Sequence, residues 1–512
     1  MAQTQARRRL PLAFVPLVLA YLAIALNMTV TNVALPTISV DLQVSAAALI
    51  WIVNVTPMAS AALVLFAGSW GDRFGRRRLL VIGLVIFLVS AILSAAVSTP
   101  WQLIVLRALT GVGSALAMPA ALALTFDVVA EPSRRTAVGI IGATQAVGSL
   151  LGPIVAGSLL LVFPWGSAFL SVVPLLLVAL VLVVWKVPAD SQREENPASL
   201  DVPGATLTGV VGVSFLYAAV TASTRDAVSD VLVILALIVG AIALVCLVAW
   251  EIRCKNPIFV GSVLRSRTFW VPTLVIFGVQ FALGGVMFLN TQYVQLVLGF
   301  SAFAAGLFLV PALGTWIASS ATAGLTARWL GVRVVVVVSL LAAAIGMVLV
   351  ASGGISPQYG LFIIGLLLVG CMGVAPALTT HMAVSAYPED RRTVGSAINS
   401  MAVRFGLAFG VATLGSVLGL VYSRDLAPAL QDMPPGDQVL ADNSLGGALQ
   451  VAARLGGPAE QALTDAARSA FASGFSVTMT SAAVILGLLA VVAAIWLPSR
   501  AARGQVVQEP TG

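Results

Sequence analysis

The chain has 512 residues, of which 59% are hydrophobic and 9% are charged, and its formal net charge is +7 at pH 7. A soluble globular domain carries about a quarter charged residues, so this composition excludes a water-soluble fold and indicates a polytopic membrane protein. The basic residues stand in short clusters between apolar runs, a placement that sets membrane orientation and does not form a nucleic-acid-binding surface.

Fourteen apolar runs that are long enough to cross a bilayer follow one another along the chain. The first run is too long for the core of a secretory signal, so we expect it to be retained as a span. Most of the 27 basic residues lie on the side of the amino terminus, which predicts cytoplasmic termini and a multi-pass protein of the plasma (inner) membrane. The expected spans are 12–35, 49–70, 79–98, 101–128, 136–160, 167–186, 203–221, 230–250, 269–297, 303–328, 333–352, 359–385, 394–421 and 475–497.

The first span carries uncharged polar residues in "ALNMTVTNVALP", residues 25–36. Asn27 and Thr31 share a helix face, so we expect them to offer hydrogen bonds to a substrate, and Asn32 to bond a neighbouring helix. Small-molecule sites combine apolar walls with a few polar groups. For each polar residue, hydrogen bonding to another helix is the equally weighted alternative. The further candidates for this lining are Asn54, Gln145, Gln280 and Asn290, with Phe277 and Trp316 as apolar walls.

The loop after the second span reads "GSWGDRFGRRRLL". Its glycines permit close helix approach and a tight turn, and its aspartate and arginines place opposite charges at the membrane surface. A purely orienting basic cluster does not need three glycines and an aspartate at this spacing. The residues concerned are Gly68, Gly71, Asp72, Arg73, Gly75 and Arg76.

The fourth and thirteenth spans each hold an arginine in their interior, Arg107 and Arg404, whereas none of the 20 acidic residues lies in the central part of a span. An unpaired membrane cation costs several kcal/mol, so we expect these arginines to meet water, backbone carbonyls or a substrate. The pattern favours a substrate that is neutral or anionic and amphiphilic.

The fifth span contains "AVGSLLGPIVAG". Gly148 and Gly152 are four residues apart and form a close-packing face, and Pro153 removes a backbone hydrogen bond and bends the helix. Ordinary membrane packing is the alternative reading of this stretch.

An internal repeat links the two parts of the chain. "PSRRTAVG" at 132–139 recurs as "PEDRRTVGS" at 388–396, Gly148 and Gly152 recur as Gly406 and Gly410, and the glycines at 68 and 75 recur at 324 and 331. Repeated halves are the architecture of a secondary transporter, with its site at their interface near the bilayer midplane. We expect an amino-terminal six-helix half at 1–187, two inserted spans at 188–267, and a carboxy-terminal six-helix half at 268–512 with a long external loop at 422–474.

The "GSWGDRFGRRR" loop resembles the signature loop of the major facilitator superfamily, and "AVGSLLGPIVAG" resembles the antiporter signature of its export branch. Together with "LRALTGVGSALAMPA" and "TNVALP", these motifs are similar to the fourteen-span drug:proton antiporter family over essentially the whole chain. The resemblance implies an all-α major facilitator fold of two six-helix halves plus two inserted helices.

The resemblance also implies residue roles. Arg107 matches an arginine linked to proton transfer, and Asp72 and Arg73 match loop residues that hold a cytoplasmic gate. Asp127 is placed like the acidic partner of the loop arginine. Family members usually carry an aspartate where this sequence has Asn27, and an amide cannot titrate, so proton coupling through this position is unavailable.

Other classes of function lack the residues they require. The single histidine, His381, excludes a histidine-cluster metal site, and the phosphate-cradling G-x-x-x-x-G-K-[ST] loop is absent. We expect no cofactor and no disulfide among Cys246, Cys254 and Cys371. A membrane-embedded enzyme would need intramembrane His, Asp or Glu clusters, and a sensor would need a cytoplasmic output domain.

The sequence thus predicts a monomeric exporter of drugs or antibiotics that works by alternating access and is driven by protons. The alternative is an exporter of a metabolite or of the host's own antibiotic, with weak or absent proton coupling.

Overall fold

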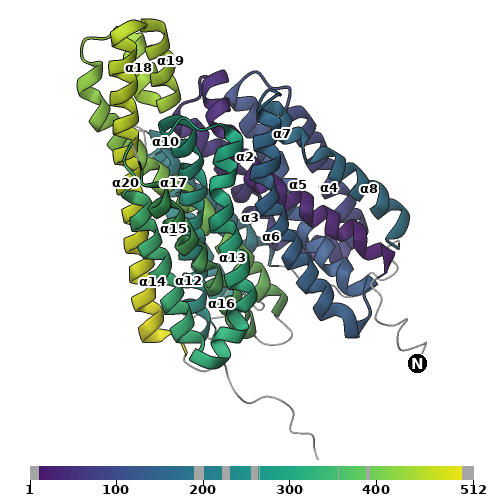
Figure 1. Ribbon diagram of the computed structural model, residues 1–512. Coiled ribbons are helices and arrows are strands. Elements are labelled where there is room, and N and C mark those ends of the chain that lie inside the picture. Colours follow the sequence, from purple (N-terminus) through teal and green to yellow (C-terminus); the bar gives the residue numbers. More distant parts are fainter. Residues whose placement is uncertain are drawn as a thin grey trace, which may run out of the picture.

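The computed structural model describes residues 11–188, 201–221, 231–254, 263, 266–355, 357–387 and 392–498, and this part of the chain is helical without any strand (Figure 1). Fourteen helices in it are long and apolar enough to cross a membrane. The first bundle contains η1 (Leu12–Phe14), α2 (Val15–Asp41), α3 (Ala46–Phe74), α4 (Arg76–Ser94), α5 (Pro100–Val128), η2 (Glu131–Ser133), α6 (Arg134–Leu160), α7 (Gly166–Leu170) and α8 (Val173–Lys186).

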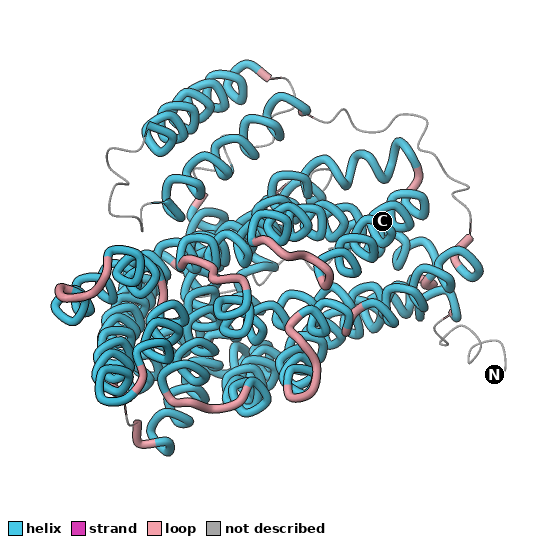
Figure 2. The backbone as a smooth tube through the Cα atoms, turned by 90° about the horizontal axis from the view of Figure 1, so that it is seen from above, coloured by secondary structure: helices cyan, strands magenta, loops and turns pink. Residues whose placement is uncertain are grey.

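The second bundle is built from the carboxy-terminal part of the chain. It contains α12 (Arg267–Gln292), continued by the π-helical turn η3 (Tyr293–Val297), then α13 (Ala302–Leu330), α14 (Val332–Ala351), α15 (Tyr359–Gly370), η4 (Cys371–Gly373), α16 (Val374–Ser385), α17 (Arg392–Leu430) and α20 (Gly457–Trp496). Between the bundles in sequence come α9 (Val202–Thr221) and α10 (Val231–Arg253), which lie along one side of the molecule in Figure 2.

The sequence repeat is reproduced in the packing of the two bundles. A Cβ atom added to Gly148 of α6 would lie 2.8 Å from Ala25 Cβ of α2, and one added to Gly406 of α17 would lie 2.5 Å from the Phe277 carbonyl oxygen of α12. Repeated glycines therefore let α6 and α17 approach the first helix of their own bundles.

The glycine pair at 75 and 331 also has one role in both bundles. Gly75 ends α3 with φ 102° and Gly331 ends α13 with φ 85°. This left-handed region is costly for residues that carry a Cβ atom, so glycine allows each helix to turn at once into the next.

The segment expected to be a long loop at 422–474 is largely helical, which corrects the bounds of the last two spans. α17 continues to Leu430, α18 (Pro435–Asn443) and α19 (Leu445–Leu455) follow, and α20 already begins at Gly457. A hydropathy profile detects where the apolar run ends, whereas a helix continues until it meets a residue that breaks it. The helix-breaking residues here are Pro434 and Gly456.

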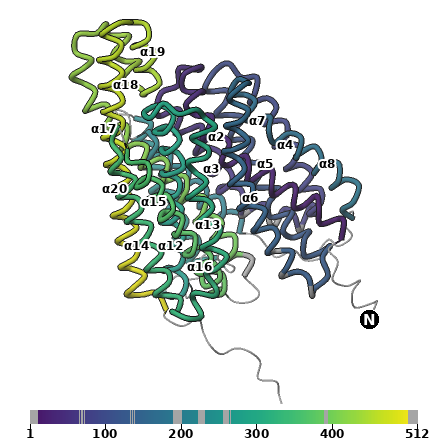
Figure 3. Tube along the Cα trace, viewed as in Figure 1, coloured from purple at the N-terminus to yellow at the C-terminus, as the bar shows by residue number. Residues whose placement is uncertain are grey.

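We call the end of the molecule that carries α18 and α19 the capped end, and the opposite end, where α2 begins and α20 ends, the terminal end (Figure 3). The bundles are joined at the capped end. Thr291 Oγ1 of α12 donates to the Asn32 carbonyl of α2 at 3.0 Å, and Gln450 Nε2 of α19 donates to the Val40 carbonyl at 2.5 Å. The cap thus bridges from the second bundle to the first.

Candidate functional site

The buried guanidinium of Arg107 lies on α5 against Asn27 of α2. Arg107 Nη1 donates to Asn27 Oδ1 at 2.8 Å, and the two residues are only 3% and 2% exposed. The Arg107 carbonyl accepts from Thr56 Oγ1 at 2.8 Å, and Arg107 Cζ lies 5.7 Å from the centre of the Phe169 ring. An amide oxygen and an aromatic face therefore surround this cation.

Arg404 is the second interior cation, and it connects the two bundles. From α17 its Nη1 donates to Ser60 Oγ of α3 at 2.5 Å, and its Nη2 lies 3.4 Å from Met118 Sδ of α5. Ser114 Oγ also donates to Ser60 Oγ at 3.2 Å, and Tyr21 OH donates to the Met118 carbonyl at 2.8 Å. All these partners of Arg404 are uncharged.

Within the described residues, neither interior arginine forms an ion pair. A guanidinium in hydrocarbon is stabilised most by a carboxylate, and neutral hydrogen-bond acceptors compensate its desolvation less completely. The site therefore has positive electrostatic character in the interior of the bundle.

The remaining candidates for the lining fall into two groups. Thr31 is buried and donates to the backbone carbonyl of Asn27 at 3.4 Å, while Asn54 and Asn290 are fully buried and their amides have no hydrogen-bond partner in the described part of the chain. Among the described residues, no hydrogen bond joins these three side chains to the guanidinium of Arg107 or Arg404. The half-buried candidates lie on α6, α12 and α13: Gln145, Gln280, Phe277 and Trp316.

The turn at Gly75 between α3 and α4 brings Arg76, the first residue of α4, to the end of α5. Arg76 Nη1 lies 2.9 Å from Asp127 Oδ1 and 3.0 Å from Oδ2. Arg73 is exposed and its guanidinium lies 5.8 Å from the centre of the Phe74 ring. Gly68 and Asp72 belong to α3, but the surroundings of both residues lie outside what the structure describes.

α6 belongs to the first bundle, and its glycines lie where it contacts helices of both bundles. One face carries Gly148 and Gly152 against α2, with a Cβ at Gly152 reaching 2.8 Å from the Leu26 carbonyl. The other face meets α13, because a Cβ at Gly306 would lie 2.6 Å from the Pro153 carbonyl. The helix α6 thus contacts α2 at Gly148 and Gly152, and it contacts α13 at Pro153.

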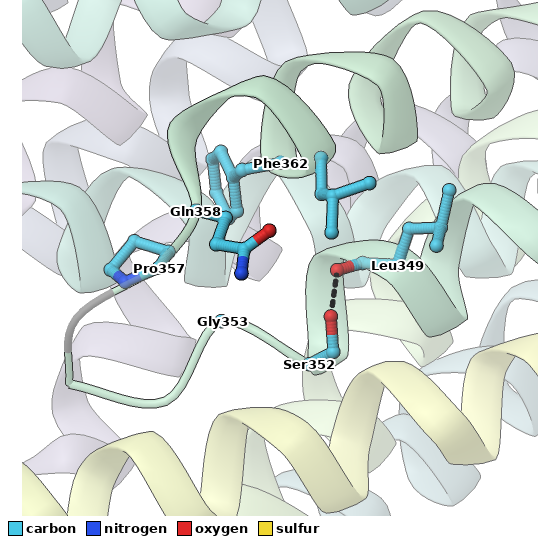
Figure 4. Close-up of a pocket in the computed structure, with 7 residues that line it drawn as sticks. Leu349, Ser352, Gly353, Pro357, Gln358 and Phe362 are labelled. Atoms are coloured by element: carbon cyan, nitrogen blue, oxygen red, sulfur yellow. Dashed lines mark hydrogen bonds between the residues drawn. The ribbon is translucent and has the colours of Figure 1, made fainter.

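A small pocket lies apart from these residues, at the capped end between α14 and α15 (Figure 4). It encloses about 280 Å³ beside Ser352, whose hydroxyl donates to the Leu349 carbonyl at 2.7 Å, and Gln358. Neither Arg107 nor Arg404 lines it.

Sequence reasoning missed Ser60, Tyr21, Met118 and Phe169, and it named Asn27 and Arg107 without pairing them. The hydroxyls and the sulfur carry no pattern that separates them from ordinary packing residues. The pairing itself had one available signal, since an interior arginine requires an acceptor and Asn27 is the amide nearest the middle of the first span.

The family model "Major Facilitator Superfamily" matches residues 17–411. The methyl viologen resistance protein SmvA of Salmonella typhimurium is 30% identical over 94% of this chain and 97% of its own length. The multidrug efflux pump LfrA of Mycolicibacterium smegmatis is 34% identical over 94% of this chain and 95% of its own.

Solved structures agree on the fold. A bacterial homolog of the human lysosomal transporter Spinster, in an inward-facing and occupied conformation, matches 94% of this chain and 95% of its own with a TM-score of 0.65 and 18% identity. The chain therefore belongs to the major facilitator superfamily, and it is a multi-pass membrane transporter of that fold, not an enzyme.

Proposed function

We propose that this protein exports small amphiphilic molecules, such as drugs or antibiotics, across the plasma membrane by alternating access. The relatives named for resistance and multidrug efflux support this assignment, since they share nearly the full length of the chain. In this proposal the two six-helix halves are residues 1–187 and 268–512, and the segment 188–267 is an insertion between them. The protein works as a monomer, and both of its termini lie in the cytoplasm. The terminal end is then the cytoplasmic end.

The observation that carries the substrate class is the contact of Arg107 with Asn27. With an amide at 2.8 Å in place of a carboxylate, the cation stays uncompensated inside the bundle, and Arg404 is held by neutral groups as well. An interior with two such cations repels lipophilic cations and attracts anionic or electron-rich groups. The substrate is therefore neutral or anionic and amphiphilic.

Proton coupling is the second element of the proposal. Export against a gradient needs an energy source, and the proton gradient supplies one to secondary transporters. Asn27 cannot carry the proton, so coupling runs through another group. The competing function is export of a metabolite or self-made antibiotic with weak or absent proton coupling. The presence of an amide at position 27, where a carboxylate could carry a proton, favours this alternative.

Purified protein in proteoliposomes tests both elements. Uptake of dyes and antibiotics of differing charge is measured with and without an imposed pH gradient. Stimulation by the gradient and a preference for neutral or anionic compounds are expected. Transport that ignores the gradient removes the antiport mechanism and leaves the uncoupled exporter, whereas a preference for cations removes the charge argument.

A further inference from the structure

The two bundles meet along two lateral seams, one between α3 and α17 and the other between α6 and α13. Both seams separate the interior of the protein from lipid. Their packing differs strongly along the length of the helices, and this difference indicates how cargo reaches the interior.

The α6–α13 seam is closed at the capped end and open at the terminal end. A Cβ at Gly157 would lie 2.6 Å from Phe303 Cα, and one at Gly306 would lie 2.6 Å from the Pro153 carbonyl. Gly139 and Gly324 stand 18 residues, or five helical turns, from Gly157 and Gly306 and so project from the same faces. A Cβ at either would meet nothing within 4 Å.

The exposure of the side chains also indicates that α6 and α13 are apart towards the terminal end. Residues 142–147 of α6 and 314–322 of α13 include no buried residue, although each stretch turns through at least one full helical turn. Gln145 and Trp316 lie within these stretches and are half-buried. These stretches therefore supply a neutral amide and an aromatic ring at the depth of the opening, a combination that suits an amphiphile.

The α3–α17 seam is covered by the inserted helix α9. Near the capped end Ser416 Oγ of α17 donates to the Ala219 carbonyl of α9 at 3.1 Å. Towards the terminal end the Cβ position of Gly209 lies 3.6 Å from Ala62 Cβ of α3. Further along, Ala205 joins a buried apolar cluster with residues of α3 and α17 such as Val64. This seam is sealed along its length.

We propose that amphiphilic cargo enters sideways from the leaflet at the terminal end, through the seam between α6 and α13, and that α9 closes the other lateral route. The inference rests on the proposed export function and specifies its entry path. It implies that the cargo is drawn from the membrane and not from bulk water.

The test uses the full-length protein in proteoliposomes and two probes, fluorescein bearing a dodecanoyl chain and fluorescein without it. Gly142→Trp and Gly324→Trp narrow the opening, where the added rings have space. Gly487→Trp is the matched control, because Gly487 also has open space but lies on α20, which is not one of the four helices that form the seams. Initial export rates give KM and kcat for each probe.

Both seam variants should raise KM for the acylated probe several-fold and leave kcat and the plain probe unchanged, and Gly487→Trp should alter neither. If both probes show the same rise in KM, or if neither KM changes, the lateral route is overturned. Transport of neither probe by the unmodified protein contradicts the export function itself, whereas transport of plain fluorescein alone contradicts only the membrane entry.

If the protein carries only the acylated probe, a second measurement tests whether the opening is exposed to lipid. A bimane label on Gly142→Cys should be quenched by brominated acyl chains, and a label on Ala62→Cys, beneath α9, should not. Absence of quenching at position 142 overturns the proposal.

Discussion

Arg107 donates a hydrogen bond of 2.8 Å to the side-chain oxygen of Asn27, so the amide occupies the position where a carboxylate would form an ion pair. Because both residues are buried, the guanidinium has no access to bulk water for compensation. Two predictions concern this contact.

Asn27→Asp places a titratable group beside Arg107. The adjacent cation favours the ionised carboxylate, so a proton taken up there at low pH would be released as the pH rises. Burial acts in the opposite direction by disfavouring the charged form, so the carboxyl can titrate above the ordinary range of an aspartate, whereas the amide cannot titrate at all. We expect export by this variant to vary with pH between about 4 and 7, with the unmodified protein flatter over that range. Initial rates in proteoliposomes buffered across this range provide the measurement, and parallel profiles for both proteins would contradict it.

Asn27→Ala removes the acceptor and leaves the guanidinium unsatisfied, which should lower stability by about 1–3 kcal/mol. The double substitution Asn27→Leu with Arg107→Met removes both polar groups and should recover most of that loss, since no orphaned charge remains. Thermal unfolding in detergent compares the three proteins. A double variant as unstable as Asn27→Ala would show that the contact itself is not the cause.

Gly152→Ala should destabilise the α2–α6 contact by about 1–3 kcal/mol, because the new methyl group meets Thr29 Oγ1 and lies 2.8 Å from the Leu26 carbonyl. Gly139→Ala on the same helix meets nothing within 4 Å and should be neutral or slightly stabilising. The difference in unfolding temperature between the two variants measures the effect of the contact alone.

A disulfide between Ser39→Cys and Gly446→Cys should hold the capped end closed and stop transport until it is reduced. The two Cβ positions lie 3.4 Å apart, close to the separation of about 3.5–4.5 Å found in disulfides. The variants are made with Cys246, Cys254 and Cys371 replaced by serine, since all three are free thiols.

Ala62→Cys with Gly209→Cys controls for oxidation, with Cβ positions 3.6 Å apart between α3 and α9. This pair should oxidise without loss of transport. If the pair at 39 and 446 oxidises fully and transport continues, the capped end does not open during the cycle.

The Arg76–Asp127 pair is 34% and 46% exposed, so Asp127→Asn should change stability by less than about 1 kcal/mol. If the pair holds the loop as a gate, the same variant should still alter the rate of export. Unfolding temperature and transport rate are therefore measured together, and an unchanged rate would leave the pair without a gating role.

The sequence predicted the fourteen spans, because hydropathy and span length directly reflect the lipid environment, and the repeated glycines identified matching helix contacts such as those of Gly148 and Gly406. It could not predict that α17 and α20 continue beyond the membrane, since polar residues such as Arg424 and Asp465 end the apolar run without ending the helix. The site was predicted as a set of residues but not as pairs. Which neutral group lies beside Arg404 depends on how the bundles dock, and no local pattern in α3 or α5 encodes that.

The lengths of α17 and α20 give the second bundle a mechanical property. Their 39 and 40 residues correspond to rods of about 58 and 60 Å, roughly twice the hydrocarbon thickness of about 30 Å. Because the cap stands at the tips of these helices, a tilt of the second bundle by about 3 degrees would move α19 against α2 by about 3 Å. That displacement is enough to break a contact such as the hydrogen bond from Gln450 to the Val40 carbonyl.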